Sequence, residues 1–339
     1  MIIATLKGPR NLIIEEVDLP KEPLGDEEIL VKTKVTAFKI GTDRGNYEGA
    51  EQVPGAPPYP RPVGDSNLGI VQSIGKNVKR FKVGERVVSR ASHQSEYVTG
   101  ISGPIVKVPE GVKDEDAVWA HLYTLSHRCF TKANFIPGEY VAVIGLGTLG
   151  LGAVGIGASI GARTIAIGNN QLRCDMAKKF GAEHTLLHSD PDIAQKLDEI
   201  TDGNGVDLVI LTANPWPAFK LSLETVRPNG RVSIVSLLGR GETELKENPL
   251  PMELFYFKGI SIISVRDPGV MGYLYPLATN QDRLSWNNQC DFVLKLMKEN
   301  KVKPSELITH RLHYKNMQTA YEMAYDRNKQ MLGVLFNWD

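Results

Sequence analysis

The sequence predicts an α/β protein in which a doubly wound parallel sheet is joined to a domain of short β-strands. Two observations lead to this prediction. From residue 140 onward, short apolar runs rich in β-branched residues alternate with helix-like stretches, an order typical of parallel strands joined by crossover helices. Residues 1–120 instead hold short alternating runs separated by Gly and Pro, which is typical of an irregular antiparallel barrel.

The predicted elements follow from these two patterns. Residues 1–120 give strands over 2–6, 12–17, 28–35, 69–74, 86–89, 95–99 and 104–108, followed by a helix over 114–133. The second pattern gives strands over 140–144, 164–167, 184–187, 206–211, 231–235 and 260–265, with helices over 148–161, 171–180, 192–201 and 217–226. The C-terminal part gives helices over 287–299 and 314–326 and a strand over 333–336.

The most informative stretch is the glycine-rich turn Gly145-Leu146-Gly147-Thr148-Leu149-Gly150. It follows a predicted buried strand and opens a predicted helix, as a dinucleotide-binding turn requires. Gly145 permits a sharp turn, Gly147 lets the backbone approach a pyrophosphate, and Gly150 lets helix and strand pack closely. The alternatives are a glycine cluster that serves packing alone, or a membrane span over 140–162. The many glycines and the αβ alternation that follows disfavour a span.

Composition narrows the class of protein. A chain of 339 residues holds about two domains. Lys and Arg total 39, as do Asp and Glu, so no basic field favours nucleic acid or an anionic membrane as a partner. The three cysteines are far apart and form neither a disulfide framework nor a metal knuckle. The first residues show no signal-peptide pattern, so we expect a cytoplasmic location.

Several spaced motifs, in a fixed order, resemble those of the medium-chain dehydrogenase/reductase superfamily, also called the zinc-type alcohol dehydrogenase-like family. They are Gly41-Thr42-Asp43, the glycine-spaced stretch 64–75, NVKRFKVGERVVS at 77–89, Ser95-Glu96-Tyr97-Val98, Pro137-Gly138-Glu139 before the glycine-rich turn, and Leu307-Ile308-Thr309-His310. The resemblance covers essentially the whole chain. It implies a GroES-like β-barrel catalytic domain over 1–120 and 269–339, a Rossmann domain over 121–268, and an active site in the cleft between them.

The resemblance also implies a homodimer or homotetramer. Relatives pair the edge strand of the Rossmann sheet across a two-fold axis, and 260–265 is an apolar candidate for that strand. Left bare, such an edge would favour aggregation.

The chain departs from the family at its zinc positions. The ligand cysteine is replaced by Ile40, and the family's GHE motif is Gly64-Asp65-Ser66. The remaining ligand position falls near Ala120. Because a catalytic zinc ion takes three N, S or O protein ligands, one carboxylate cannot hold it. The four-cysteine lobe of a structural zinc is also missing, so we expect a protein with neither zinc site.

Without zinc, other groups must polarise and protonate a substrate carbonyl. The candidates are Thr42, which matches the family's relay hydroxyl, Tyr47 on a loop that borders the cleft in relatives, Asp65, and His93. Burial of Asp65 could raise its pKa into the range of a general acid, and His93 is expected to titrate near neutrality. Each has a plainer interpretation as a loop, capping or solvated residue. Lys39 is a further candidate in the predicted cleft, but it is expected to be a solvated charge. His121 is expected to pack or face water.

Arg173 indicates which nicotinamide cofactor is used. Gly168 occupies the position where NAD-dependent relatives carry an acidic residue, and Arg173 stands where NADP-dependent relatives carry a cation. With Asn169 and Asn170, it could bind a 2′-phosphate, although Arg173 could equally be an ordinary solvated helix residue. We therefore favour NADP (NADPH) over NAD. The full set of candidate cofactor residues is Thr124, which matches a family threonine beside the nicotinamide, Gly145, Gly147, Thr148, Leu149, Gly150, Gly168, Asn169, Asn170, Arg173 and Thr212.

Three functions remain open at this point. The first is a zinc-independent, NADP(H)-dependent alcohol dehydrogenase or carbonyl reductase acting on a small polyol- or sugar-like molecule. The second is an enoyl or quinone reductase acting on an activated C=C bond. The third is a non-catalytic NADPH-binding protein. The substrate itself is not evident. Pocket candidates are Trp119, Tyr123, Tyr273, Tyr275 and Trp286.

Overall fold

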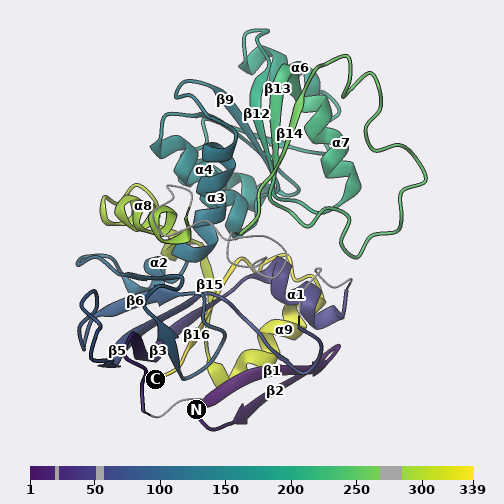
Figure 1. Ribbon diagram of the computed structural model, residues 1–339. Coiled ribbons are helices and arrows are strands. Elements are labelled where there is room, and N and C mark those ends of the chain that lie inside the picture. The colour runs from purple at the N-terminus through teal and green to yellow at the C-terminus, as the bar shows by residue number, and fades with distance from the viewer. Residues whose placement is uncertain (20–22, 51–56, 268–284) are drawn as a thin grey trace. The chain divides into compact units, whose positions relative to one another are not determined.

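The computed structural model describes residues 1–19, 23–50, 57–267 and 285–339. The chain divides into two compact units, one made of Met1–Thr124 and Pro268–Asp339, the other of Leu125–Asp267. The described residues of one unit form two β-sheets and those of the other form one, as Figure 1 shows.

The unit over Leu125–Asp267 contains a parallel sheet of six strands among the described residues. Its spatial order is β11-β10-β9-β12-β13-β14. The strands are β9 (Tyr140–Ile144), β10 (Arg163–Gly168), β11 (His184–Leu187), β12 (Val206–Leu211), β13 (Val226–Ile234) and β14 (Ser261–Ser264). Since β9 pairs with β10 on one side and β12 on the other, the strand order reverses at β9. This reversal is the point where open α/β sheets bind ligands.

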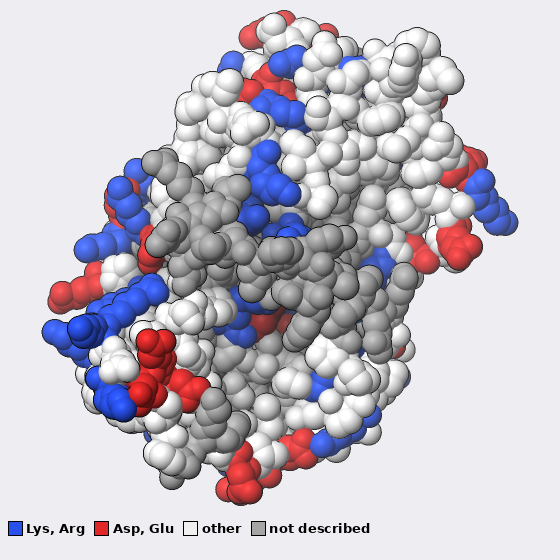
Figure 2. Space-filling model, viewed as in Figure 1, with Lys and Arg blue, Asp and Glu red and all other residues white. Residues whose placement is uncertain are grey.

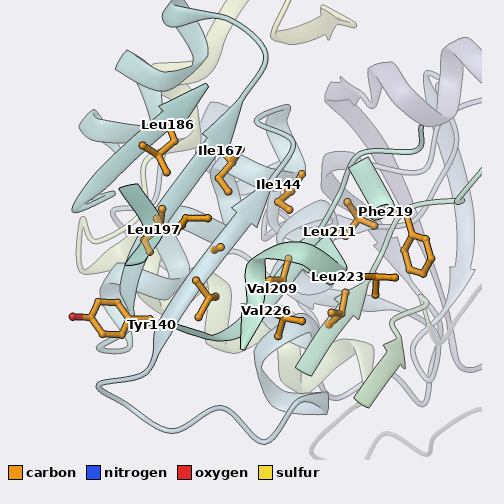
Figure 3. Packing of buried hydrophobic residues seen from close by; sticks show 14 of the residues in the cluster. Tyr140, Ile144, Ile167, Leu186, Leu197, Val209, Leu211, Phe219, Leu223 and Val226 are labelled. Atoms are coloured by element: carbon orange, nitrogen blue, oxygen red, sulfur yellow. The ribbon is translucent and has the colours of Figure 1, made fainter. Parts of the chain in front are cut away.

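Helices cover both faces of this sheet, with α4 on one side of the strands and α6 and α7 on the other (Figure 1). Their bounds are α4 (Thr148–Ser159), α5 (Gln171–Lys179), α6 (Ile193–Ile200) and α7 (Trp216–Thr225). Figure 3 shows the apolar core, in which Ile144, Ile167 and Leu211 come from three neighbouring strands. All five residues of β9 are buried, as expected for a strand covered on both faces.

The other unit is built mainly on antiparallel strands, with β15 and β16 paired in parallel. One sheet has the order β15-β16-β3-β5-β6-β8, with β7 paired to β3, and a smaller one has the order β2-β1-β4. Their bounds are β1 (Ile2–Gly8), β2 (Asn11–Glu16), β3 (Glu28–Phe38), β4 (Arg61–Pro62), β5 (Asn67–Ile74), β6 (Arg86–Ser89), β7 (Glu96–Gly100), β8 (Ile105–Lys107), β15 (Ile308–His313) and β16 (Gly333–Asn337). The predicted fold class, an α/β protein with a β domain and a doubly wound parallel sheet, is confirmed.

Two helical predictions need correction. No helix was expected over α1 (Ile40–Glu48), which packs against α9 and ends at Gly49 with φ +73°. The predicted helix over 114–133 is two helices, α2 (Asp114–Ala117) and α3 (Ala120–Lys132). The other helical elements are α8 (Trp286–Lys298), η1 (Pro304–Leu307), η2 (Tyr314–Asn316) and α9 (Met317–Tyr325).

The surface carries both signs of charge. On the face drawn in Figure 2, basic and acidic side chains are interspersed, in keeping with the equal totals of the sequence. Within the described ranges, no helix is both long enough and apolar enough to cross a membrane.

Candidate functional site

The turn after β9 has the shape that a dinucleotide phosphate needs. Gly145 has φ +98°, in the left-handed region that favours glycine. A Cβ on Gly150 would lie 1.9 Å from the Gly145 carbonyl oxygen, so turn and helix approach as closely as only glycine allows. At Gly147 the nearest atom to such a Cβ is Arg173 Nη1, at 4.0 Å. The Gly147 backbone therefore has room beside it for a ligand.

The N-terminus of α4 adds hydrogen-bond donors at this turn. Gly147 is the N-cap residue and supplies no side-chain cap, so the first backbone N–H groups of α4 can bind an anion. Thr148 and Leu149 stand in this first turn. Thr212 plays a different part, because its Oγ1 donates to the Gly145 carbonyl oxygen at 2.7 Å and braces the turn from the end of β12.

Arg173 lies against the glycine-rich turn. Its Nη1 donates to the Leu146 carbonyl oxygen at 2.8 Å, and burial lowers the pKa of its guanidinium. Asn170 is the N-cap of α5, where its Oδ1 accepts from the Arg173 backbone N–H at 3.0 Å and its Nδ2 donates to Asn169 Oδ1 at 3.2 Å. Arg173 is therefore anchored to the turn and is not an ordinary solvated helix residue.

Gly168, at the end of β10, has little room for a side chain. A Cβ there would lie 2.9 Å from Leu146 Cδ1 and 3.0 Å from Cys174 Sγ. An acidic residue at this position would require both neighbours to shift.

Thr124 lies on α3 with its side chain buried. It is 1% exposed, and its Oγ1 donates to the His121 carbonyl oxygen at 2.6 Å. Its hydroxyl is therefore engaged within its own helix.

Four side chains of the other unit form a connected polar chain. The Lys39 ammonium forms an ion pair with Asp65 Oδ2, and His121 Nε2 faces the same oxygen at 3.4 Å. Trp286 Nε1 donates to His121 Nδ1 at 2.7 Å. Because an indole N–H can only donate, Nδ1 must carry a lone pair, which puts the imidazole proton on Nε2, toward Asp65. Lys39, Asp65, His121 and Trp286 are called the lysine–aspartate chain below.

Two expectations about this group were wrong. Lys39 was expected to be solvated, yet it is 7% exposed, because it follows directly on the buried end of β3. The pKa of Asp65 was expected to rise. Burial does act in that direction, but the charge of Lys39 and the hydrogen bonds from Lys39 and His121 outweigh it and hold the pKa well below its ordinary value. Asp65 is therefore ionised and is no general acid near neutral pH.

Asp43 contacts the lysine–aspartate chain through the backbone of Lys39. Its Oδ2 accepts from the Lys39 backbone N–H at 2.8 Å. Burial and the charge of Asp65 raise the pKa of Asp43 to about 7, against the opposing effect of Lys39 and of backbone N–H groups. Burial and the charges of Asp43 and Asp65 likewise raise the pKa of the Tyr321 hydroxyl. Asp43 thus fixes the backbone of Lys39.

His93 is fully buried beside this group. Its ring packs under Gly64, which has φ +82°, and edge-on against Phe336 at 5.1 Å between centroids. Among the described residues, neither ring nitrogen has a hydrogen-bond partner. Titration near neutrality was expected and is wrong, since burial lowers the pKa of His93 to about 3. His93 is a neutral imidazole at physiological pH.

The structure does not bring Tyr47 or Thr42 into the lysine–aspartate chain. Tyr47 is fully buried between α1 and α9, where its hydroxyl donates to Glu322 and accepts from Gln318 Nε2 at 2.7 Å. Thr42 is exposed in the first turn of α1. Of the four catalytic candidates, the structure therefore groups Asp65 with His93. Tyr273 and Tyr275 lie outside the described residues.

Sequence reasoning missed the partners of Asp65. Lys39 and His121 are 26 and 56 positions away from it, so only the fold brings them together. The one available signal was the place of Lys39, between a predicted buried strand and the Gly41-Thr42-Asp43 motif.

The family resemblance assigns the zinc-ligand positions to Ile40, Asp65 and Ala120. Ile40 and Ala120 carry no donor, and the carboxylate of Asp65 already pairs with an ammonium. Zinc needs three protein ligands, and no group of three His, Cys, Asp or Glu side chains in the described ranges could hold a metal ion.

Comparisons with known proteins agree with this architecture. The model of the alcohol dehydrogenase GroES-like domain matches residues 25–111, and that of the zinc-binding dehydrogenase family matches residues 148–271. The sorbitol dehydrogenase of Halalkalibacterium halodurans is 24% identical over 94% of each chain. The L-threonine 3-dehydrogenase of Photorhabdus laumondii is 25% identical over 95% of this chain and 96% of its own.

Solved structures share the fold over nearly the whole chain. Galactitol-1-phosphate dehydrogenase of Escherichia coli has a TM-score of 0.82 at 19% identity, covering 99% of this chain and 100% of its own. A short chain alcohol dehydrogenase of Escherichia coli CFT073, complexed with NADH, has a TM-score of 0.80 at 21% identity and 99% coverage of both chains. A Sinorhizobium meliloti 1021 protein described as a zinc-binding dehydrogenase, bound to NADP, has a TM-score of 0.78 at 18% identity, covering 99% and 98%.

The family models match a part of each unit, and the two curated relatives cover 94% and 95% of this chain. The family, together with the two cofactor-bound structures, supports a nicotinamide cofactor. The chain belongs to the medium-chain dehydrogenase/reductase superfamily of oxidoreductases.

Proposed function

We propose that the protein is a zinc-independent, NADP(H)-dependent dehydrogenase or carbonyl reductase. It transfers a hydride between the nicotinamide and the carbon of an alcohol or carbonyl group on a polyol- or sugar-like substrate. The observation that carries this proposal is the arrangement at the carboxyl end of β9. There an open glycine-rich turn meets an uncapped helix N-terminus, with Arg173 alongside and no carboxylate at position 168.

The preference for NADP follows from charge. A carboxylate at the end of the second strand accepts hydrogen bonds from the ribose hydroxyls of NAD and repels a 2′-phosphate. Gly168 removes that repulsion, and the anchored guanidinium of Arg173 supplies a cation with several donors.

An Arg173→Ala variant tests this preference. Hydrogen bonds to charged groups contribute about 1.5–3 kcal/mol, so we expect the KM for NADPH to rise roughly 10- to 100-fold while that for NADH changes less. Arg163→Ala is the matched control, since Arg163 lies at the opposite end of β10, in an exposed ion pair with Glu183. Equal losses with NADPH and NADH would contradict a role for Arg173 at the 2′-phosphate.

The substrate class rests on relatives. Their names include sorbitol, galactitol-1-phosphate and 2R,3R-butanediol dehydrogenases, all of which point to hydroxyl-bearing carbon chains. Zinc independence rests on Ile40, Ala120 and the ion pair that already engages Asp65.

A substrate panel separates this function from the alternatives. Sorbitol, 2,3-butanediol and L-threonine would be offered with NADP⁺ or NAD⁺, and D-fructose, 2,3-butanedione and an enone with NADPH or NADH. We expect turnover of an alcohol or carbonyl with NADP(H), on protein assayed in parallel for zinc. Reduction of the enone alone would favour an enoyl or quinone reductase. Binding of NADPH without turnover of any compound would favour a non-catalytic protein.

We further propose that two copies of the chain pair through β14. This strand ends the described sheet, with Ser261 and Ser264 exposed, and the nearby Tyr256 and Phe257 are 72% and 73% exposed. Sedimentation should give a dimer or tetramer that Ile263→Lys dissociates, because a charge blocks an edge strand from pairing. A wild-type chain that stays monomeric at every concentration would contradict this assembly.

A further inference from the structure

The fold holds Lys39 in a fixed position. The residue links β3 to α1, its backbone N–H donates to Asp43 Oδ2 at 2.8 Å, and its carbonyl oxygen accepts from the Asp43 backbone N–H at 2.9 Å. The side chain is 8% exposed, and a lysine this deeply buried needs a charged partner. Asp65 is that partner.

The Asp65–Lys39 pair has hydrogen-bonding capacity that the described residues do not use. Both Lys39 and His121 face Asp65 Oδ2, while the buried Oδ1 has no hydrogen-bond partner among the described residues. An ammonium has three N–H donors, and within the described part of the chain Asp65 is the only acceptor bonded to Lys39. The Asp65 side chain is 23% exposed, so the pair is open to a small polar molecule.

The place of this cation is informative. Lys39 directly precedes Ile40, and Asp65 stands in the sequence Gly64-Asp65-Ser66, so the ammonium pairs with one of the residues that the family resemblance assigns to zinc-ligand positions. A zinc ion would supply electrophilic polarisation of a substrate oxygen. In this chain Asp65 holds a lysine ammonium instead.

We propose that the Lys39 ammonium binds and polarises the oxygen of the reacting carbonyl or alcohol, in the role that a metal ion fills in relatives. This inference rests on the proposed function. In reduction, the hydride leaves the nicotinamide ring of NADPH for the carbonyl carbon, and the C=O π electrons move to the oxygen. That oxygen takes a proton from Lys39 Nζ, and the resulting amine regains one from water. NADP⁺ and the alcohol are the products.

The remaining members of the lysine–aspartate chain are positioning residues. Trp286 holds His121 with its Nε2–H toward Asp65, and His121 and Asp65 together orient the ammonium. The carboxylate of Asp65 also holds the ammonium in place through their ion pair.

Lys39→Met and Lys39→Arg test the proposal, with Lys34→Met as the matched control. Lys34 lies on β3, the strand that ends just before Lys39, and pairs with Asp114 at 2.5 Å, but its side chain is 42% exposed. With 2,3-butanedione or D-fructose and NADPH, we expect Lys39→Met to lower kcat about 100- to 1000-fold, as loss of one donor to a developing oxyanion does, without changing NADPH affinity. Lys39→Arg should retain part of the activity, and Lys34→Met nearly all of it.

Two further measurements separate chemistry from folding. Lys39→Met leaves Asp65 unpaired, so Lys39→Met/Asp65→Leu removes both charges together, and NADPH fluorescence reports whether either variant is folded. Ethylammonium added to Lys39→Ala should restore turnover in proportion to its concentration, which a purely structural lysine would not allow. If wild type is active and Lys39→Met is equally active, or ethylammonium gives no rescue, the role of Lys39 is refuted alone. If wild type turns over no compound of the panel, the proposed function fails, and this role with it.

Discussion

The buried, unpaired imidazole of His93 makes the stability of the protein sensitive to acid. The pKa of His93 is lowered from 6.5 to about 3, mainly by burial, with Lys39 adding to the effect and Asp65 opposing it. In the unfolded chain this side chain binds a proton near pH 6.5, whereas in the folded protein it stays neutral until about pH 3. Its contribution to stability is therefore complete above pH 6.5 and is lost as the pH falls from 6.5 toward 3.

The size of the stability change follows from the difference between the folded and unfolded pKa values of His93. Each pKa unit corresponds to about 1.36 kcal/mol, so the full contribution is roughly 5 kcal/mol. Between pH 6.5 and 4.5, wild type should lose about 2 kcal/mol more of its free energy of unfolding than a variant without this imidazole.

Urea unfolding at several pH values measures this difference. His93→Phe keeps a ring against Phe336, and His93→Leu shows whether the result depends on packing. The absolute stabilities of these variants will differ, so the test compares how steeply the free energy of unfolding of each protein changes with pH. The exposed His188 provides the control, since His188→Gln should follow the wild-type slope. Parallel slopes for wild type and both His93 variants would refute the claim that a neutral, buried His93 governs acid stability.

Three other substitutions test the site. Because the pKa of Asp43 is raised to about 7, its contribution to stability is present below its ordinary value of 3.8 and is lost as the pH rises through 7. Asp43→Asn should therefore lose less free energy of unfolding than wild type between pH 5 and 8, as measured by urea unfolding. The same dependence on pH in both proteins would contradict this. Gly150→Ala puts a methyl group 1.9 Å from the Gly145 carbonyl oxygen, and such overpacking costs about 1–3 kcal/mol. Fluorescence titration should therefore show an NADPH affinity roughly 10- to 100-fold weaker than that of wild type. An unchanged Kd for NADPH would mean that the turn does not hold the cofactor. Gly168→Asp should shift the ratio of kcat/KM from NADPH toward NADH, through repulsion of the 2′-phosphate, and an unchanged ratio would remove the basis for NADP preference.

The sequence predicted the parallel unit well because its signals are local. The strand over 140–144 matches β9 in full, since a short apolar run bounded by Gly145 can be recognised without knowing its neighbours. The predicted strand over 164–167 lies within β10, and the helix over 148–161 overlaps α4 almost completely.

The helix α1 could not be predicted in the same way. Gly41 and Gly45 both lower helix propensity, and the segment has no apolar periodicity of its own. Packing of Tyr47 against Tyr321 of α9, nearly three hundred residues later, stabilises it. The break between α2 and α3 was also missed, because no Gly or Pro marks it.

The site was only partly predictable for a related reason. The glycines and Arg173 were found because a local motif marks them, and Asp65 because it stands at a recognisable position. The direction of its pKa was wrong because that direction is set by Lys39 and His121, which the chain places far from it. Charge pairing across a fold is a tertiary property, and it decides whether Asp65 acts as an acid or as an anchor.

Hydride exchange with NADPH and NADH, on protein whose zinc content is assayed in the same preparation, tests zinc-free catalysis most directly. We expect turnover of an alcohol or carbonyl compound of the panel with NADP(H) preferred and no stoichiometric zinc. One zinc ion per chain, or strict use of NADH, would contradict the interpretation of the lysine–aspartate chain or of Gly168 and Arg173.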